Sequence, residues 1–363
     1  MNDFFDDNQI ALAKRGCTSE LALAFHGMAF KILSDDSGVL NLLRDYFSGL
    51  TETGTETPTT QQRVYLVNKS MDTSKIHWTP VERIKASSLG LKEAYADVPG
   101  GRWIHKVRTG MVMFQALTDP IIFGDLREHI SQVINFINNQ FLNYQQRQGY
   151  LLGHASAFNI DGSVTAIAAS SGGGKSTLML KALEADNTRF LSNDRILFKV
   201  AGDQVRILGL AKHPRVNPGT LINSQRLQSI LPESERKRFE GMPQGQLWDI
   251  EQKYDVLIPQ AYGEDKAALS GRLKNLVLLD WTLGASEPTA LSTVDIRANP
   301  EALEGLRKSP GPFFQQADGR FPPEQSRSAD IYVENLRGVQ IWRLAGKVDF
   351  ERAIALLHEK GVL

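Results

Sequence analysis

The sequence of 363 residues predicts an α/β fold, because three successive patterns place a strand, a glycine-rich turn and a helix in order. Residues 164–168 are apolar and partly β-branched, as in a buried strand. Residues 169–177 read ASSGGGKST, and residues 178–185 carry apolar side chains at helical spacing. This order of elements is the context in which a phosphate-binding loop occurs.

The loop residues predict how the phosphates of ATP would be held. Glycines let backbone N–H groups approach phosphate oxygens without Cβ clashes, and the helix N-terminus adds partial positive charge. Lys175 is expected on the β- and γ-phosphates and the Ser176 hydroxyl on Mg²⁺. Ala169 replaces the usual first glycine, and a surface turn is the alternative that the flanking elements disfavour. The predicted ATP-binding residues are Ser170, Ser171, Gly172, Gly173, Gly174, Lys175, Ser176 and Thr177.

Two further residues stand at predicted strand ends. Residues 149–153 run into His154, and the short apolar pair 190–191 leads into Asn193 and Asp194. If these ends meet beside the loop, an acid there can hold Mg²⁺ or accept a proton from an attacking hydroxyl. The alternatives are a structural histidine and an ordinary Asn-Asp turn.

The stretch from His154 to Arg195 resembles the catalytic domain of HPr kinase/phosphorylase, the bacterial enzyme that phosphorylates a serine of a carrier protein. That family has a histidine ahead of its loop, a Ser-Gly-x-Gly-Lys-Ser loop, and an acidic pair followed by arginine. These features correspond to His154, residues 171–176 and residues 193–195. A more specific resemblance is to the branch called HprK-related kinase B, in residues 212–220, 247–255 and 308–313.

The resemblance implies a P-loop-containing, HPr kinase-like (PEP carboxykinase-like) nucleotide core that uses ATP and Mg²⁺. Asp194 matches the family's acid/base, and with Ser176 it would hold the metal. His154 matches a histidine near the transferred phosphoryl group, and Lys175 the phosphate-binding lysine. The resemblance also implies a homo-oligomer.

The sequence departs from the family in two places. Asn193 stands where the family has its first acid, and it cannot act as a base. The downstream Glu-x-Arg-Gly-x-Gly segment is replaced by residues 215–219, which keep Arg215 and a glycine but have no glutamate. Arg215 would clamp phosphate or pair with a carboxylate. The nearby charged residues Glu251, Lys253 and Asp255 form either a substrate-side or a structural ion network.

Residues 1–147 are predicted to form a strand-rich N-terminal α+β module without a catalytic motif. Residues 51–60 form a polar loop with no apolar side chain to bury. The predicted elements are a hairpin in 19–34, a helix in 38–50, a strand in 63–67, a hairpin around 99–101 and a helix in 126–147.

Residues 148–363 are assigned to the HPr kinase-like P-loop catalytic domain, with a helical insertion at about 221–270. A strand at 276–279 ends at Asp280, which is a rival to Asp194 for the metal. The tail is predicted to hold a strand at 338–342 and a final helix, with Asp349 as its N-cap and Gly361 as its stop.

The composition favours a cytoplasmic protein. There are 41 Lys plus Arg and 41 Asp plus Glu residues, so bulk electrostatics do not favour a nucleic-acid partner. The single cysteine, Cys17, excludes an internal disulfide. The acidic N-terminus lacks the basic start of a signal peptide, and no apolar run is long enough to span a membrane.

The leading hypothesis is an ATP-dependent kinase that transfers the γ-phosphoryl group to a hydroxyl of a protein serine or a small molecule, with Asp194 as the base. The alternative is an ATP-binding regulatory or scaffold protein without phosphotransfer. The sequence does not assign the acceptor.

Overall fold

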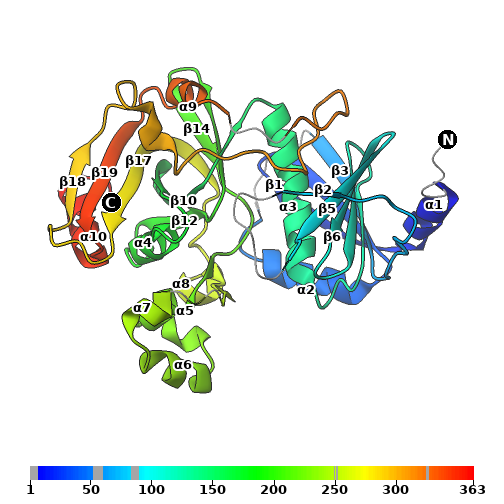
Figure 1. The fold of residues 1–363 in the computed structure, drawn as a ribbon, viewed down its shortest axis with the longest axis horizontal. Coiled ribbons are helices and arrows are strands. Elements are labelled where there is room, and N and C mark those ends of the chain that lie inside the picture. Colours follow the sequence, from blue (N-terminus) through cyan, green and yellow to red (C-terminus); the bar gives the residue numbers. More distant parts are fainter. Residues whose placement is uncertain (1–6, 52–59, 83–89, 249, 251, 324–326) are drawn as a thin grey trace. The chain divides into compact units, whose positions relative to one another are not determined.

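The computed structural model describes residues 7–51, 60–82, 90–248, 250, 252–323 and 327–363. The chain divides by its contacts into two compact units, and each has its own large sheet with helices (Figure 1). Unit 1 comprises residues 1–148 with 309–325, and unit 2 comprises residues 149–308 with 326–363. Most of the predicted polar loop 51–60 lies outside the described residues.

Unit 1 is an eight-stranded sheet in the order β1-β2-β3-β8-β7-β6-β5-β4. The predicted hairpin in 19–34 is confirmed, with positive φ at His26 and Gly27 turning β1 into β2. The strands are β1 Ser19–Phe25, β2 Met28–Ser34, β3 Thr60–Val67, β4 Thr79–Pro80, β5 Glu93–Val98, β6 Gly101–Lys106, β7 Met111–Ala116 and β8 Ile121–Phe123; the helices are α1 Asp7–Gly16, α2 Ser37–Phe47 and α3 Ile130–Arg147.

Two details of unit 1 differ from the sequence interpretation. Helix α3 begins at Ile130 rather than 126, because the Asp125 carboxylate accepts from the Glu128 N–H and closes a separate turn first. Residues 309–325 were assigned to the second domain, yet they pack in unit 1. There the Asn143 side chain donates to the Phe313 carbonyl and accepts from the Gln315 N–H.

Unit 2 is a nine-stranded mixed sheet, with the path β12-β10-β11-β17-β14-β13-β9 and β19 paired to β17 and β18. Strand β17 runs parallel to β11 and β19, and Ala168 at the end of β11 is level with Leu278. The strands are β9 Leu151–Gly153, β10 Ala155–Ile160, β11 Ser163–Ala168, β12 Thr188–Ser192, β13 Ile196–Ala201, β14 Gln204–Leu208, β17 Ser270–Thr282, β18 Ala290–Thr293 and β19 Gln340–Lys347.

The insertion after β14 contains several short helices, which form a group apart from the sheet (Figure 1). It contains α5 Pro218–Ile222, η1 Gln228–Ile230, α6 Glu233–Glu240, α7 Gln244–Trp248, α8 Ile258–Tyr262 and the strand pair β15 Arg215–Val216 with β16 Tyr254–Asp255. The other helices of unit 2 are α4 Lys175–Ala182, η2 Pro300–Leu303, α9 Ala329–Asn335 and α10 Phe350–Glu359.

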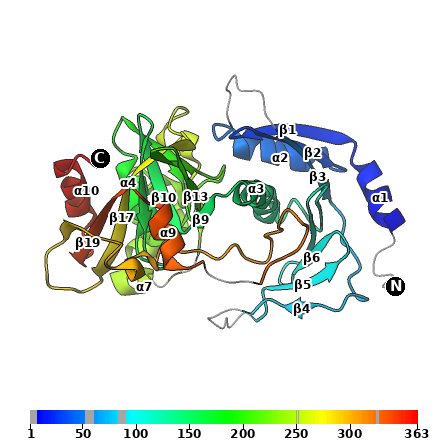
Figure 2. The same ribbon diagram turned by 90° about the horizontal axis from the view of Figure 1, so that it is seen from above.

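The end of the chain agrees with its predicted caps. The Asp349 carboxylate accepts from the Arg352 N–H at 3.0 Å, so Asp349 is the N-cap of α10. Gly361 has a φ of 63°, the left-handed conformation that stops a helix. Seen from above, α10 lies beside β19 and close to α4 (Figure 2). Within the described part of the chain, every helix is too short or too polar to cross a membrane.

Candidate functional site

The glycine-rich loop joins β11 to α4, so the predicted strand, turn and helix are present. Gly172 and Gly174 have φ angles of 79° and 89°, which glycine adopts with little strain. A Cβ at Gly173 would lie 2.8 Å from the Ala169 Cβ, and one at Gly174 would lie 3.0 Å from the Phe350 ring. The backbone of the loop therefore requires glycines where the sequence has them.

Side chains from the ends of β17 and α10 hold the loop. The Trp281 indole N–H donates to the Gly173 carbonyl at 2.9 Å, and its ring meets Phe350 edge-on at 4.9 Å. Successive strand residues point to opposite faces, so Asp280 faces away from the loop. There its carboxylate binds the Arg343 guanidinium, with Nε at 2.7 Å. This direction argues against Asp280 as the metal ligand.

Lys175 is a buried cation at the start of α4, with 7% of its surface exposed. Its ammonium donates to the Ala169 and Ser170 carbonyls, each at 2.9 Å. Burial lowers the pKa of Lys175 to about 8, the charges of Lys308 and Lys253 act in the same direction, and Asp194 opposes them. The loop thus holds the Lys175 ammonium in place by hydrogen bonds, and Asp194 interacts electrostatically with this cation.

Asp194 lies in the turn between β12 and β13, directly beside His154. The register pairs Ile196 with Gly153, which brings this turn next to the end of β9. One Asp194 carboxylate oxygen lies 3.5 Å from His154 Nε2, and the other lies 3.7 Å from Arg195 Nε. The structure therefore brings two of the three predicted catalytic residues, His154 and Asp194, together at adjacent strand ends.

The charge state of Asp194 follows from these neighbours. Burial alone would raise the pKa of its carboxyl, but the interaction with His154 and the charges of Arg195 and Lys212 outweigh burial. They hold the pKa well below its usual range, so Asp194 is ionised at neutral pH and is a weak base. Its backbone has a φ of 71°, in the left-handed region that aspartate and asparagine tolerate better than most residues.

Asn193 precedes Asp194 in the same turn. It is buried, and its side-chain oxygen accepts a hydrogen bond from the Ser156 hydroxyl of β10 at 2.8 Å. A carboxylate in its place would bury a negative charge, which is costly unless it is paired. The Asn193 side chain therefore joins β10 to the β12–β13 turn through this hydrogen bond, rather than serving the glycine-rich loop.

Lys212 is a residue of this site that the sequence interpretation missed. Burial lowers its pKa to about 8; Arg195 and Arg215 act in the same direction, while Asp194 and Asp255 oppose them. It thus lies among the charges that surround Asp194. Two sequence signals were available: its place in the segment 212–220 that resembles HprK-related kinase B, and its position three residues before Arg215.

Arg215 is paired with a carboxylate. It lies opposite Asp255 in the β15–β16 pair, and its Nε is 3.2 Å from an Asp255 oxygen. Burial raises the pKa of Asp255 despite the nearby charges of Arg215 and Lys212. Of the charged cluster around Arg215, Asp255 takes part in this pair, and Glu251 lies outside the described residues.

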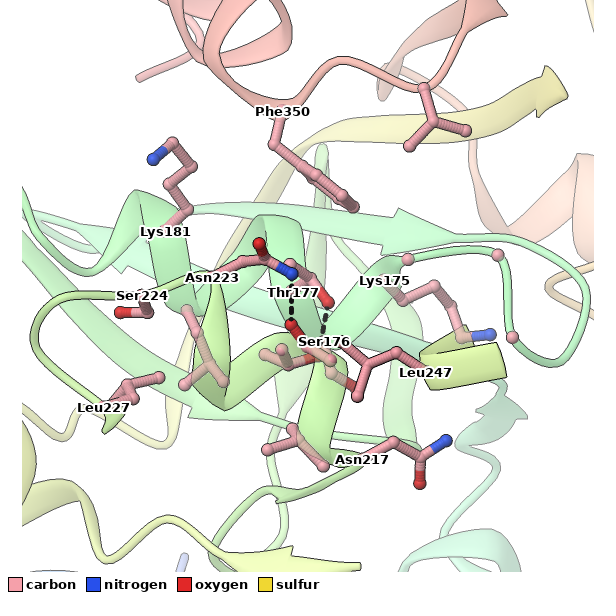
Figure 3. Close-up of a pocket in the computed structure, with 18 of the residues that line it drawn as sticks. Lys175, Ser176, Thr177, Lys181, Asn217, Asn223, Ser224, Leu227, Leu247 and Phe350 are labelled. Carbon is pink, nitrogen blue, oxygen red and sulfur yellow. Dashed lines mark hydrogen bonds between the residues drawn. The ribbon is translucent and has the colours of Figure 1, made fainter. Parts of the chain in front are cut away.

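A cavity of about 430 Å³ opens at the loop (Figure 3). Its walls are the loop residues 172–177, the exposed side of α4, residues 215–227, and a rim at 348–351. Thr177 is fixed to the opposite wall, because its hydroxyl lies 2.8 Å from that of Thr220. Lys175, Ser176, Thr177 and Arg215 line the cavity, whereas His154, Ser170, Ser171 and Asp194 are not among the described residues that do.

The predicted donors for a metal are the Ser176 hydroxyl and the Asp194 carboxylate. The described residues contain no group of three or more histidine, cysteine, aspartate or glutamate side chains arranged to hold a metal ion. Mg²⁺ usually binds through one or two protein oxygens together with water and substrate phosphates. The residues therefore fit an Mg²⁺ ion that arrives with a nucleotide.

The sequence matches no known family model and no curated protein. Among solved structures, the Hpr(Ser) kinase/phosphatase from Coxiella burnetii is similar over 58% of this chain and 90% of that chain, with 12% sequence identity and a TM-score of 0.29. Because identity and TM-score are this low, the likeness does not decide the activity. The function of the chain has to be argued from its own side chains.

Proposed function

We propose that this protein is an ATP-dependent phosphotransferase of the HPr kinase type, which transfers the γ-phosphoryl group of ATP to a hydroxyl. One observation carries the proposal. An ionised Asp194 is held beside His154 and Arg195, and its charge reaches the buried Lys175 of a glycine-rich loop. An acceptor for a hydroxyl proton thus lies close to the cation that would bind the phosphates.

In this proposal the loop and the start of α4 bind the triphosphate. The backbone N–H groups of residues 172–176 and the helix N-terminus supply partial positive charge. Lys175 leaves the carbonyls of Ala169 and Ser170 and binds the β- and γ-phosphate oxygens instead. The phosphate charges favour its protonated form. Mg²⁺, held by Ser176 and Asp194 when bound, would neutralise charge on the phosphates.

Asp194 would act on the acceptor. The acceptor oxygen forms a bond to the γ-phosphorus, the bond to the β–γ bridging oxygen breaks, and ADP leaves. The hydroxyl proton passes to Asp194. A carboxylate with a low pKa is a weak base, and this suits a loose transition state in which the nucleophile has formed little bond. Asp194 would orient the hydroxyl first and take its proton late.

Cationic and polar side chains around Asp194 would assist. His154 lies at the adjacent strand end, and Lys212 supplies a partly buried positive charge. Positive charge fixed beside the transferring group stabilises the transition state without reorganisation. Arg215 would join them only by sharing or leaving its pair with Asp255.

A specific observation favours the alternative, a regulatory or scaffold protein that binds ATP without transferring phosphate. Asn193 replaces an acid of the family and is bound to Ser156, so the site has one carboxylate where the family has two. Such a protein would bind nucleotide tightly and leave it intact.

Mass spectrometry separates the two functions. The protein is incubated with γ-labelled ATP, Mg²⁺ and a cell extract, and labelled proteins and metabolites are identified. A hydroxyl-bearing acceptor that is labelled by the unmodified protein and not by Asp194→Asn supports the phosphotransferase. Tight ATP binding with no labelled acceptor favours the scaffold.

A further inference from the structure

The part of the cavity that extends beyond the loop, between α4 and the helical insertion, has no role in the proposed phosphoryl transfer. We infer that it binds the nucleoside end of ATP, so that the triphosphate runs from the cavity over the loop toward Lys175 and Asp194. The inference rests on the proposed function, and it assigns the part of the insertion that lines the cavity, namely lining residues within 217–227 together with Leu247 and Tyr262, as the nucleoside-binding wall.

The direction of the nucleotide follows from the loop. The lysine of such a loop reaches the β- and γ-phosphates. The Lys175 ammonium lies against the carbonyls of Ala169 and Ser170. A Cβ at Gly305 would lie 2.8 Å from the Ala169 carbonyl carbon, and the carbonyl of the next residue, Leu306, accepts from the His154 N–H at 2.7 Å. This side of the loop is therefore the side of His154 and of its neighbour Asp194. Figure 3 shows this ammonium directed away from Thr177 and Asn223. The γ-phosphate end is therefore on the Asp194 side, and the α-phosphate end is at Thr177.

The cavity opens at this α-phosphate end. Beyond the loop it is lined by Leu180 and Lys181 of α4 and by Glu184, which follows this helix. Neither Asp194 nor His154 is found among the described lining residues. The space that continues from Thr177 is thus suited to the part of ATP that does not react.

The size and chemistry of the cavity suit a nucleoside. Its volume of about 430 Å³ lies within the range of roughly 300–1,000 Å³ common for small-molecule sites. Apolar side chains from both walls and an aromatic ring at the rim offer contacts for a base, namely Leu180, Leu227, Leu247 and Phe350. The side-chain amides of Asn217 and Asn223 and the hydroxyl of Ser224 offer hydrogen bonds.

The two walls are already joined to each other. Tyr262 of the insertion donates its hydroxyl to the Leu180 carbonyl at 2.9 Å, and Thr177 contacts Thr220 at 2.8 Å. Lys181 pairs with Glu351 of the rim at 2.5 Å. A site that is formed before binding loses less entropy when the ligand arrives. The insertion is therefore built onto the loop helix as a fixed wall.

Two glycine-to-leucine variants test the inference. At Gly219 a Cβ would lie 3.6 Å from Leu247 Cγ, an ordinary contact, so Gly219→Leu places its side chain among the cavity walls. At Gly245, on α7 of the same insertion, a Cβ meets nothing within 4 Å, and this residue does not line the cavity. Gly245→Leu is therefore the matched control.

Dissociation constants are measured for ATP and for inorganic tripolyphosphate, which lacks the nucleoside. We expect unmodified protein to prefer ATP, and Gly219→Leu to weaken ATP at least tenfold while tripolyphosphate binds as before. Gly245→Leu should change neither constant. Unchanged tripolyphosphate binding also shows that the variant is folded.

Two results would overturn the inference: equal binding of ATP and tripolyphosphate by the unmodified protein, or an equal effect of Gly219→Leu on both ligands. The proposed function fails differently, because a protein that prefers ATP through the cavity yet labels no acceptor keeps the nucleoside site and loses the phosphotransfer.

Discussion

Replacing Asp194 by asparagine removes one charge from the site and keeps the shape of the side chain. The carboxylate lies 3.5 Å from His154 Nε2 and 3.7 Å from Arg195 Nε. It also interacts electrostatically with Lys212 and Lys175. The substituted amide would neither take a proton nor balance these cations. Binding of ATP should change little, because the loop N–H groups, Lys175 and Ser176 still hold the triphosphate, while the transfer step loses its proton acceptor.

The magnitude follows from that loss. Removing a positioned general acid–base group costs on the order of 10²-fold or more in rate, and about 10² corresponds to about 2.7 kcal/mol of transition-state stabilisation. Asp194 is a weak base because its pKa is low, so we expect a rate loss near 10²-fold, the smaller end of this range. The loss should appear in kcat, with KM for ATP within a few-fold of its original value.

Asp280→Asn is the matched control for this substitution. Asp280 is the other acid at a strand end near the loop, but it faces Arg343 on the opposite side of β17. Transfer is measured as labelled product from γ-labelled ATP, together with the dissociation constant for ATP. If Asp280→Asn abolishes transfer and Asp194→Asn is mild, the chemistry has been placed at the wrong carboxylate.

Three further expectations concern the charges and the direction of the reaction. Lys175→Ala should abolish transfer and weaken ATP binding, which is measured by calorimetry. Because the pKa of Lys175 is about 8, the affinity of the unmodified protein for ATP should fall as the pH rises through that value. The Lys175→Ala variant should lack this pH dependence. Lys212→Met should slow transfer by about 10²-fold without loss of ATP binding, and an unchanged rate would remove Lys212 from the site. Finally, the phosphorylated acceptor with inorganic phosphate and no ADP should release pyrophosphate far more slowly than the forward reaction, because Asn193 is bound to Ser156 and supplies no second acid; equal rates would contradict this.

Much of the secondary structure follows from local patterns. The β1–β2 hairpin, α2 and the capped α10 each depend on neighbours in sequence, namely two positive-φ turn residues, an amphipathic pattern and an Asp349 cap. The length of strand β17 was underestimated, because only its apolar centre, residues 276–279, is recognisable as a strand in the sequence. Its first half alternates between exposed and buried positions, a weaker signal.

The site shows the limit of such patterns. The loop was predictable because a glycine-rich turn, a lysine and a helix start are contiguous. The direction of Asp280 was not, because it depends on Trp281 facing the loop, and this is set by the register of β17 with β11 and β19. Lys212 was missed for a similar reason. Its environment is created by Asp194 and Asp255, which the fold brings to it from other parts of the chain.

The backbone of Asp194 decides which substitution can separate a kinase from a scaffold. With a φ of 71°, this residue occupies the left-handed region, which costs most residues roughly 1–2 kcal/mol and which aspartate and asparagine tolerate better. Asp194→Ala would therefore strain the turn between β12 and β13, and a lost activity would have two explanations. Asp194→Asn keeps the backbone preference and removes only the charge and the proton acceptor. A scaffold that uses the turn solely for its shape should be indifferent to asparagine and sensitive to alanine, whereas a phosphotransferase should lose its transfer rate with either.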